Sequence, residues 1–150
     1  MQVRRNDFDV TNRIQTTDRE SVEREINRLF RLLYPGVAHA SMEQAFADFA
    51  ALYRGDYPGY QASDTVFHDV QNVMEVTLAM TRLMDGYERS RLDSPPLDAR
   101  LYQLGVSLAL FHDVGFVKKT NDTTVSSGAF YTSSHVSRGT QFLREYLPRI

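Results

Sequence analysis

Apolar residues recur every three or four positions in the first third of the chain, which is the spacing of amphipathic helices. A first helix is predicted to begin near Asp18 or Ser21, either of which can act as its N-cap, and to end at Tyr34-Pro35-Gly36. Its apolar stripe consists of Val22, Ile26, Leu29, Phe30 and Leu33. Ser41-Met42-Glu43-Gln44 has the pattern of a capping box and predicts the start of a second helix. The stripe of this second helix consists of Ala45, Phe46, Phe49, Leu52 and Tyr53.

Two more helices are predicted between the glycine- and proline-containing loop at residues 55–63 and position 112. The first of them is capped by Asp64 or Thr65, and Gly86 lies near its end. Its stripe consists of Val66, Val70, Val73, Val76 or Thr77, Met80, Leu83 and Met84. The second starts at Ser94-Pro95-Pro96, because proline fits the first turn of a helix. Its stripe consists of Leu97, Leu101, Leu104, Leu108 and Phe111.

The rest of the chain completes an all-α prediction. Residues 114–133 are rich in Thr, Ser, Asn and Gly and predict a long surface loop. A last helix is predicted to be capped by Ser133 or Ser134. Its inward residues are Val136, Phe142, Leu143 and Leu147. Residues 1–17 lack periodicity and predict a flexible N-terminal lead-in, and no segment alternates as a strand would. The predicted fold of residues 18–150 is therefore a single domain, a compact bundle of about five helices.

The composition excludes several kinds of site. The chain has 150 residues, a formal net charge of -2 and no cysteine, so a metal site would be built from His, Asp, Glu or water. Lys and Arg are spread along the sequence without a basic stripe, so no nucleic-acid partner is expected. The apolar runs are far shorter than the roughly 20 residues of a membrane span, and the N-terminus has no apolar signal core. We therefore expect a cytoplasmic protein without a membrane partner.

The dipeptide His112-Asp113 is the strongest candidate for chemistry. It directly follows an apolar run that ends at Phe111, and it precedes Gly115. A neutral imidazole and a carboxylate are suitable ligands for a divalent metal, and both groups need partners when they are buried. The alternative interpretation is structural, with a histidine that favours the dipole at the end of its helix and an aspartate that caps the following loop.

Two other histidines lie in recognisable surroundings. His68 precedes Asn72 by four residues, so both are expected to project from one face of the same helix, where a buried Asn72 needs a partner. His135 begins the last predicted helix. The alternative interpretations are an amphipathic first-turn histidine for His68 and a capping or surface histidine for His135.

Together these segments resemble the HD superfamily of metal-dependent phosphohydrolases, which are all-helical and include the cyclic-nucleotide phosphodiesterases. The resemblance covers roughly residues 60 to 148. Phe67-His68-Asp69-Val70-Gln71-Asn72 is similar to the family segment that reads aromatic, His, Asn or Asp, two variable residues and His. Phe111-His112-Asp113-Val114-Gly115 matches the namesake motif, and His135-Val136-Ser137-Arg138-Gly139 with Phe142-Leu143 is similar to the later histidine helix. An HD-like helical domain is therefore expected.

The resemblance implies a metal-dependent hydrolase that acts on a phosphoester, such as a nucleotide or a related small molecule. Its cofactor is expected to be a divalent ion, either Mg²⁺, Mn²⁺, iron or zinc. Asp113 is expected to be the anionic metal ligand, which bridges if two ions bind, and His112 a neutral ligand. His68 is expected to lie outside the metal shell and to protonate the leaving oxygen. His135 is expected to face the phosphate or a second metal.

Two lysines extend this expected site. Lys118 and Lys119 follow the namesake motif and are expected to offset the charge of the substrate phosphate. The alternative is that both are solvated loop residues.

The chain departs from the family pattern at two ligands. The position of the first metal ligand, a histidine in the family, holds Asn72, whose amide oxygen suits Mg²⁺ better than a transition metal. The family's last ligand is an aspartate on a later helix, whereas the last aspartate here is Asp122. We therefore expect the C-terminal helices of the family to be missing, and this ligand to come from further chain or a partner, or to be absent. The competing function is a degenerate HD module that binds a nucleotide or a protein partner without turnover.

Overall fold

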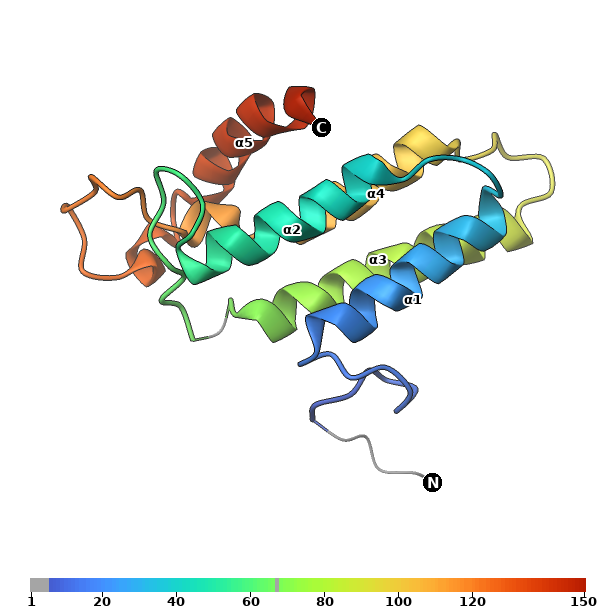
Figure 1. Cartoon of the computed structure of the whole chain (residues 1–150), viewed down its shortest axis with the longest axis horizontal. Helices are drawn as coiled ribbons and strands as arrows, with labels where there is room; N and C mark the ends of the chain where they lie inside the picture. The colour runs from blue at the N-terminus through green and yellow to red at the C-terminus, as the bar shows by residue number, and fades with distance from the viewer. Residues whose placement is uncertain (1–5, 67) are drawn as a thin grey trace. The chain divides into compact units, whose positions relative to one another are not determined.

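The computed structural model describes residues 6–66 and 68–150, and these form five α-helices (Figure 1). The α-helices are α1 (Arg19–Leu33), α2 (Ala40–Arg54), α3 (Val70–Ser90), α4 (Ala99–Leu110) and α5 (His135–Tyr146). Three short 3-10 helices are η1 (Val114–Phe116), η2 (Gly128–Tyr131) and η3 (Leu147–Arg149). The described residues contain no named strand and two isolated β-bridges, Phe8 with Gln15 and Tyr60 with Lys119. The predicted fold class, all-α with about five helices, is confirmed.

The described residues divide into two compact units. The first contains the residues up to position 39 and those from 70 to 109, and the second contains those from 40 to 69 and from 110 to 150. Phe67, the aromatic position of the predicted opening motif, and residues 1–5 of the predicted lead-in lie outside the described residues. No helix of the described part is both long enough and apolar enough to cross a membrane.

In the first unit, α1 packs along α3 (Figure 1). The Asp18 carboxylate caps α1 by accepting hydrogen bonds from the backbone N–H of Glu20 and the hydroxyl of Ser21. Of the two predicted caps, Asp18 is therefore the N-cap. The predicted stripe of α1 is confirmed at Val22, Ile26, Leu29 and Phe30, which are buried. The buried Tyr102 of α4 contacts α1, with its ring centre 5.6 Å from that of Phe30.

The buried faces of α3 and α4 differ from the predicted stripes. The helix α3 begins at Val70, after the predicted caps, and its buried residues are Val73, Met74, Thr77, Leu78 and Thr81. Several residues of the predicted stripes are exposed instead of buried. They are Val66 before α3, Val70, Val76, Met80 and Leu83 on α3, and Leu101, Leu104 and Leu108 on α4. The hydroxyls of Thr77 and Thr81 donate to the carbonyls of Val73 and Thr77 at 2.7 and 2.8 Å. Because their hydroxyls are satisfied by these bonds, the two threonines can lie on a buried face. A prediction that counts only apolar residues does not place them there.

The helix α4 also begins later than the prolines predict. It starts at Ala99, and the Asp98 carboxylate accepts a hydrogen bond from the backbone N–H of Leu101 at 2.7 Å. Asp98 therefore satisfies a free N–H of the first turn, so the predicted start at Ser94-Pro95-Pro96 is wrong.

In the second unit, α2 and α5 supply most of the apolar core. The predicted stripe of α2 is confirmed, since Ala45, Phe46, Phe49, Leu52 and Tyr53 are all buried. The predicted capping box is wrong, because the helix already includes Ala40 and Ser41 lies inside it. On α5 the buried residues are Gly139, Phe142 and Tyr146, whereas Val136 is 68% exposed.

The aromatic core of the second unit centres on Phe111. Its ring centre lies 5.3 Å from that of Phe142 and 4.7 Å from that of Tyr146. The Tyr146 hydroxyl donates a hydrogen bond of 2.8 Å to Asp48 of α2, so its polar end is satisfied inside the core. These contacts join α5 to α2 and to the residue just before His112.

Residues 6–17 of the predicted lead-in fold around the carboxylate of Asp9. The flexibility predicted for this segment stays a prediction. Asp9 is 4% exposed and accepts hydrogen bonds of 2.9 Å from the backbone N–H groups of Arg13 and Ile14. It also accepts bonds of 2.7 Å from the Thr11 hydroxyl and from Arg82 of α3.

The pKa of Asp9 follows from these surroundings. Burial raises the pKa, but the hydrogen bonds from Ile14, Thr11 and Arg82 outweigh burial and hold it well below the ordinary value of 3.8. A carboxyl with a depressed pKa contributes stability above its unfolded-state pKa and loses that contribution as the pH falls through its folded-state pKa.

We expect Asp9→Asn to lower the free energy of unfolding at neutral pH by about 2 kcal/mol, because Arg82 loses its buried charge partner. The deficit should shrink below about pH 4, where the wild-type carboxyl begins to lose its own contribution. Urea titrations at pH 7, 5 and 3 measure both effects. The exposed Asp93→Asn is the control and should change little. An Asp9→Asn deficit that stays the same at pH 7 and pH 3 would contradict this account.

Candidate functional site

The carboxylate of Asp113 is the centre of the candidate site. Asp113 follows the buried Phe111 by two residues, and only 8% of its side chain is exposed. His68 Nδ1 donates to its Oδ2 at 2.7 Å, and His112 Nε2 lies 3.1 Å from the same oxygen. A carboxylate this deeply buried needs such partners, so two imidazoles from separate parts of the second unit converge on one oxygen.

The loop before His68 is held by the residues predicted to cap a helix. The Asp64 carboxylate accepts hydrogen bonds from the backbone N–H of Gly128 at 2.8 Å and the hydroxyl of Ser127 at 3.2 Å. The Thr65 hydroxyl donates to the backbone carbonyl of His68 at 3.2 Å. The prediction that Asp64 or Thr65 caps a helix is therefore wrong. Their side chains instead fix the loop that carries His68 toward Asp113.

Phe116 of η1 lies between two histidine rings. Its ring is stacked on that of His68 at 4.1 Å between centres and on that of His135 at 4.4 Å, each with an interplanar angle of 15°. His135 Nδ1 donates to the carbonyl of Thr132 at 2.8 Å, which fixes the orientation of that ring. His135 thus contacts Phe116, and no contact of its ring with Asp113 is among those of the described residues.

The first part of the predicted surface loop is buried, because η1 passes directly under α5. A Cβ atom on Gly115 would overlap the backbone carbonyl of His135, so only glycine fits this crossing. At Gly139 a Cβ atom would instead meet Val114 at an ordinary 3.5 Å. The loop prediction therefore holds for the exposed residues further along and is wrong for residues 114–117.

Arg138 has a structural role that its position in the predicted motif does not indicate. Its guanidinium donates to the carbonyls of Gly115 at 2.8 Å and Val117 at 3.1 Å, and it lies over the ring of Tyr131 at 3.6 Å. It therefore joins α5, η1 and η2 around Phe116. The sequence offers only a weak signal for this role, because the acceptors are backbone carbonyls, which every residue carries.

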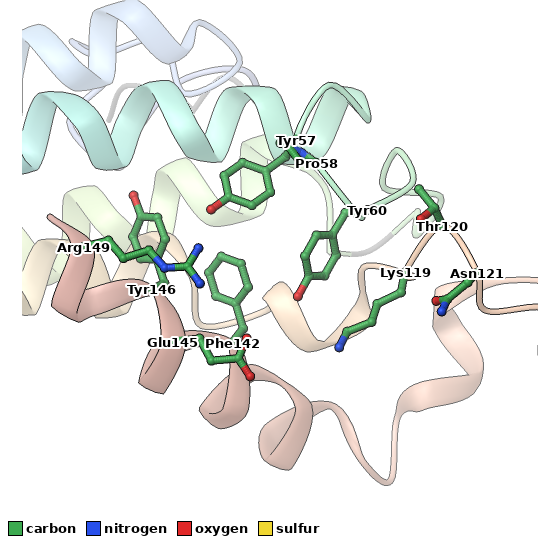
Figure 2. Close-up of a pocket in the computed structure, with 11 residues that line it drawn as sticks. Tyr57, Pro58, Tyr60, Lys119, Thr120, Asn121, Phe142, Glu145, Tyr146 and Arg149 are labelled. Atoms are coloured by element: carbon green, nitrogen blue, oxygen red, sulfur yellow. The ribbon is translucent and has the colours of Figure 1, made fainter.

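The remaining predicted site residues lie in different places. Asn72 is on α3 in the first unit, where it lines a pocket of about 330 Å³ with Asp9 and Glu75. Its predicted role as a metal ligand stays a prediction. Lys118 is half-buried, and its carbonyl accepts a hydrogen bond of 2.9 Å from the backbone N–H of Gln61. Lys119 points into a second pocket, of about 400 Å³ (Figure 2).

Few of the described side chains around Asp113 are available as metal ligands. Among residues 6–66 and 68–150, no three His, Asp or Glu side chains are placed so that they could hold a metal ion. A structural zinc site takes about four protein ligands, whereas Mg²⁺ keeps several waters and binds one or two carboxylates with substrate phosphates. An ion held by Asp113 and His112 would therefore take most of its ligands from water or substrate.

Tyr53 of α2 belongs to the surroundings of the same carboxylate. Burial raises the pKa of its hydroxyl, and the negative charges of Asp113 and Asp69 raise it further. Tyr53 is therefore a neutral phenol at all pH values near neutrality. The backbone carbonyl of Tyr53 also accepts a hydrogen bond of 3.1 Å from Ser63, at the start of the segment that leads to His68.

We expect Gly115→Ala to lower the free energy of unfolding by about 3 kcal/mol, because its methyl group would overlap the backbone of α5 and force the crossing apart. Two matched glycine variants serve as controls in the same denaturation assay. Gly139→Ala should change little, and Gly86→Ala should gain up to about 1 kcal/mol, because it adds a methyl group in open space on a helix. Wild-type stability in Gly115→Ala would contradict the close crossing.

Comparisons of the chain with protein-family models, with curated proteins and with solved structures find no match. The geometry around Asp113 and the motif residues quoted above are therefore the basis on which a function can be proposed.

Proposed function

We propose that the chain is a metal-dependent phosphohydrolase of the HD superfamily that acts on a phosphoester, such as a nucleotide or a related small molecule. The observation that carries this proposal is the convergence of His68 and His112 on one buried oxygen of Asp113. These three residues come from two of the three segments on which the resemblance depends. The HD-like nature of the helical fold and a cytoplasmic location belong to the same proposal.

Asp113 and His112 would hold the divalent ion. Asp113 supplies the negative charge, and His112 Nε2 lies 3.1 Å from its carboxylate. The ion would be Mg²⁺, Mn²⁺, iron or zinc, and it would take water and substrate oxygens at its remaining positions. When bound, such an ion lowers the pKa of a coordinated water and supplies a nucleophile near neutral pH.

His68 would protonate the leaving oxygen. Its Nδ1 is held by Asp113 and its ring by Phe116, so the orientation of the imidazole is set before a substrate arrives. The other ring nitrogen, Nε2, can then exchange a proton with the substrate, and 39% of the side chain is exposed to allow its approach. A positioned acid of this kind contributes a rate factor of about 10²–10⁴.

The other predicted residues have supporting roles in the proposal. His135 and Lys118 would face the phosphate. Lys119 is better suited to the separate pocket that it lines. No nucleic acid or membrane partner is part of the proposal.

A second candidate function is a degenerate HD module that binds a nucleotide or a protein partner without turnover. The observation that favours it is the number of ligands, since fewer than three His, Asp or Glu side chains are grouped for a metal among the described residues. A site with two protein donors holds an ion weakly unless the substrate adds its own oxygens.

The two candidates differ in turnover. We expect the purified chain to hydrolyse bis(4-nitrophenyl) phosphate when Mn²⁺ or Mg²⁺ is present. Asp113→Asn should lower kcat/KM by about 10³-fold, because it removes the anionic ligand and the partner of both imidazoles. His68→Gln should lower kcat by about 10²-fold and leave Mn²⁺ binding, measured by calorimetry, unchanged.

Asp56→Asn is the matched control for these variants, because Asp56 is an exposed residue of the second unit that pairs with Arg54. It should keep wild-type turnover, and circular dichroism checks that every variant is folded. Nucleotide binding without turnover under any divalent ion would favour the second candidate. Turnover that survives Asp113→Asn would place the chemistry elsewhere.

A further inference from the structure

A pocket in the second unit is walled by aromatic rings. Tyr57, Tyr60 and Phe142 point toward one another in it, with ring centres 5.8 to 6.2 Å apart (Figure 2). The volume of the pocket, about 400 Å³, lies within the range of small-molecule sites. Its lining contains none of His68, Asp113 or the other histidines. This pocket is therefore separate from the cluster around Asp113.

Two cationic side chains reach into the pocket from opposite sides. Lys119 extends from the loop after η1 and Arg149 from η3 (Figure 2). Within the part of the chain that the structure describes, neither is in an ion pair, and Arg149 donates a hydrogen bond to the Tyr57 hydroxyl. The lining holds one carboxylate, Glu145, against these two cations. The balance of charge therefore favours an anionic group on a bound molecule.

The two walls that carry Lys119 and Tyr60 are joined by backbone hydrogen bonds. Gln61 donates to the carbonyl of Lys118 at 2.9 Å, and Thr120 donates to the carbonyl of Gly59 at 3.0 Å. The side chain of Gln61 also donates to the carbonyl of Lys119 at 2.9 Å. Gly59 has a φ of +85°, which glycine adopts without strain. The backbone segments that carry Lys119 and Tyr60 are thus joined to each other before any ligand binds.

The tyrosine hydroxyls at this site are neutral donors at physiological pH. Burial raises the pKa of both Tyr57 and Tyr60. The charge of Asp48 adds to this for Tyr57 and the charge of Glu145 for Tyr60, whereas Arg149 acts in the opposite direction on both. Each hydroxyl can therefore donate a hydrogen bond to an anionic oxygen.

We propose that this pocket binds a small planar aromatic molecule that carries a negatively charged group. The ring of the ligand packs against Tyr57, Tyr60 and Phe142, and its anionic group pairs with Lys119 or Arg149. Aromatic rings favour offset-stacked or edge-to-face contacts, and phosphate or carboxylate oxygens form charge-assisted hydrogen bonds with guanidinium and ammonium groups. The site is independent of the proposed hydrolysis at Asp113.

The probe is 1-naphthylphosphonate, whose P–C bond a phosphoester hydrolase does not cleave. Inorganic phosphate and 1-naphthol represent its two halves. By calorimetry, the whole probe should bind at least about tenfold more tightly than either half, because both the ring and the charge contribute. Lys119→Gln and Arg149→Gln should together weaken the binding of the probe by about tenfold or more.

Matched control variants locate the bound probe. Lys118→Gln and Arg144→Gln change neighbouring cations that do not line the pocket, and both should keep wild-type affinity. Asp113→Asn should also keep it, which separates this test from that of the proposed hydrolase. The proposal is overturned if the double variant binds the probe as wild type does, if Asp113→Asn abolishes binding, or if phosphate alone binds as tightly as the whole probe.

Discussion

The close crossing of η1 under α5 is the constraint on which the second unit depends. Because Gly115 has no side chain, the backbone of η1 can approach the first residue of α5 directly. This approach brings Phe116 against the ring of His135 and lets Arg138 bond the carbonyls of η1. Each contact is weak by itself, but together they hold the segment that follows Asp113 in one place.

The buried charge of Asp113 is stable only because this frame delivers partners to it. Phe116 orients the ring of His68 by stacking, and the loop before His68 is fastened to η2 through Asp64. His112 reaches the same carboxylate from the adjacent position in the chain. The result is a carboxylate oxygen on which two imidazoles converge, and this arrangement is the physical reason for proposing phosphoester chemistry here.

The sequence predicts those features that depend on local pattern. The stripe of α2 is confirmed, and so is that of α1 except at Leu33, because most apolar residues of each helix lie on one side. On α3 the apolar residues extend round the helix, and two buried threonines satisfy their own hydroxyls, so the inward face is mispredicted. The pairing of His68 with Asp113 joins residues 45 positions apart, and the hydrogen bonds of Arg138 go to backbone carbonyls. Neither contact can be derived from spacing along the chain.

The most direct test of this account is the nitrogen NMR spectrum of the histidine side chains in wild type and in Asp113→Asn. The central claim is that one carboxylate oxygen holds both imidazoles at 2.7 and 3.1 Å. The account predicts that the ring nitrogen resonances of His68 and His112 both shift in the variant, because His68 loses a charged hydrogen-bond acceptor and His112 loses a negative charge 3.1 Å away. Unchanged resonances for either histidine in a folded variant would contradict it.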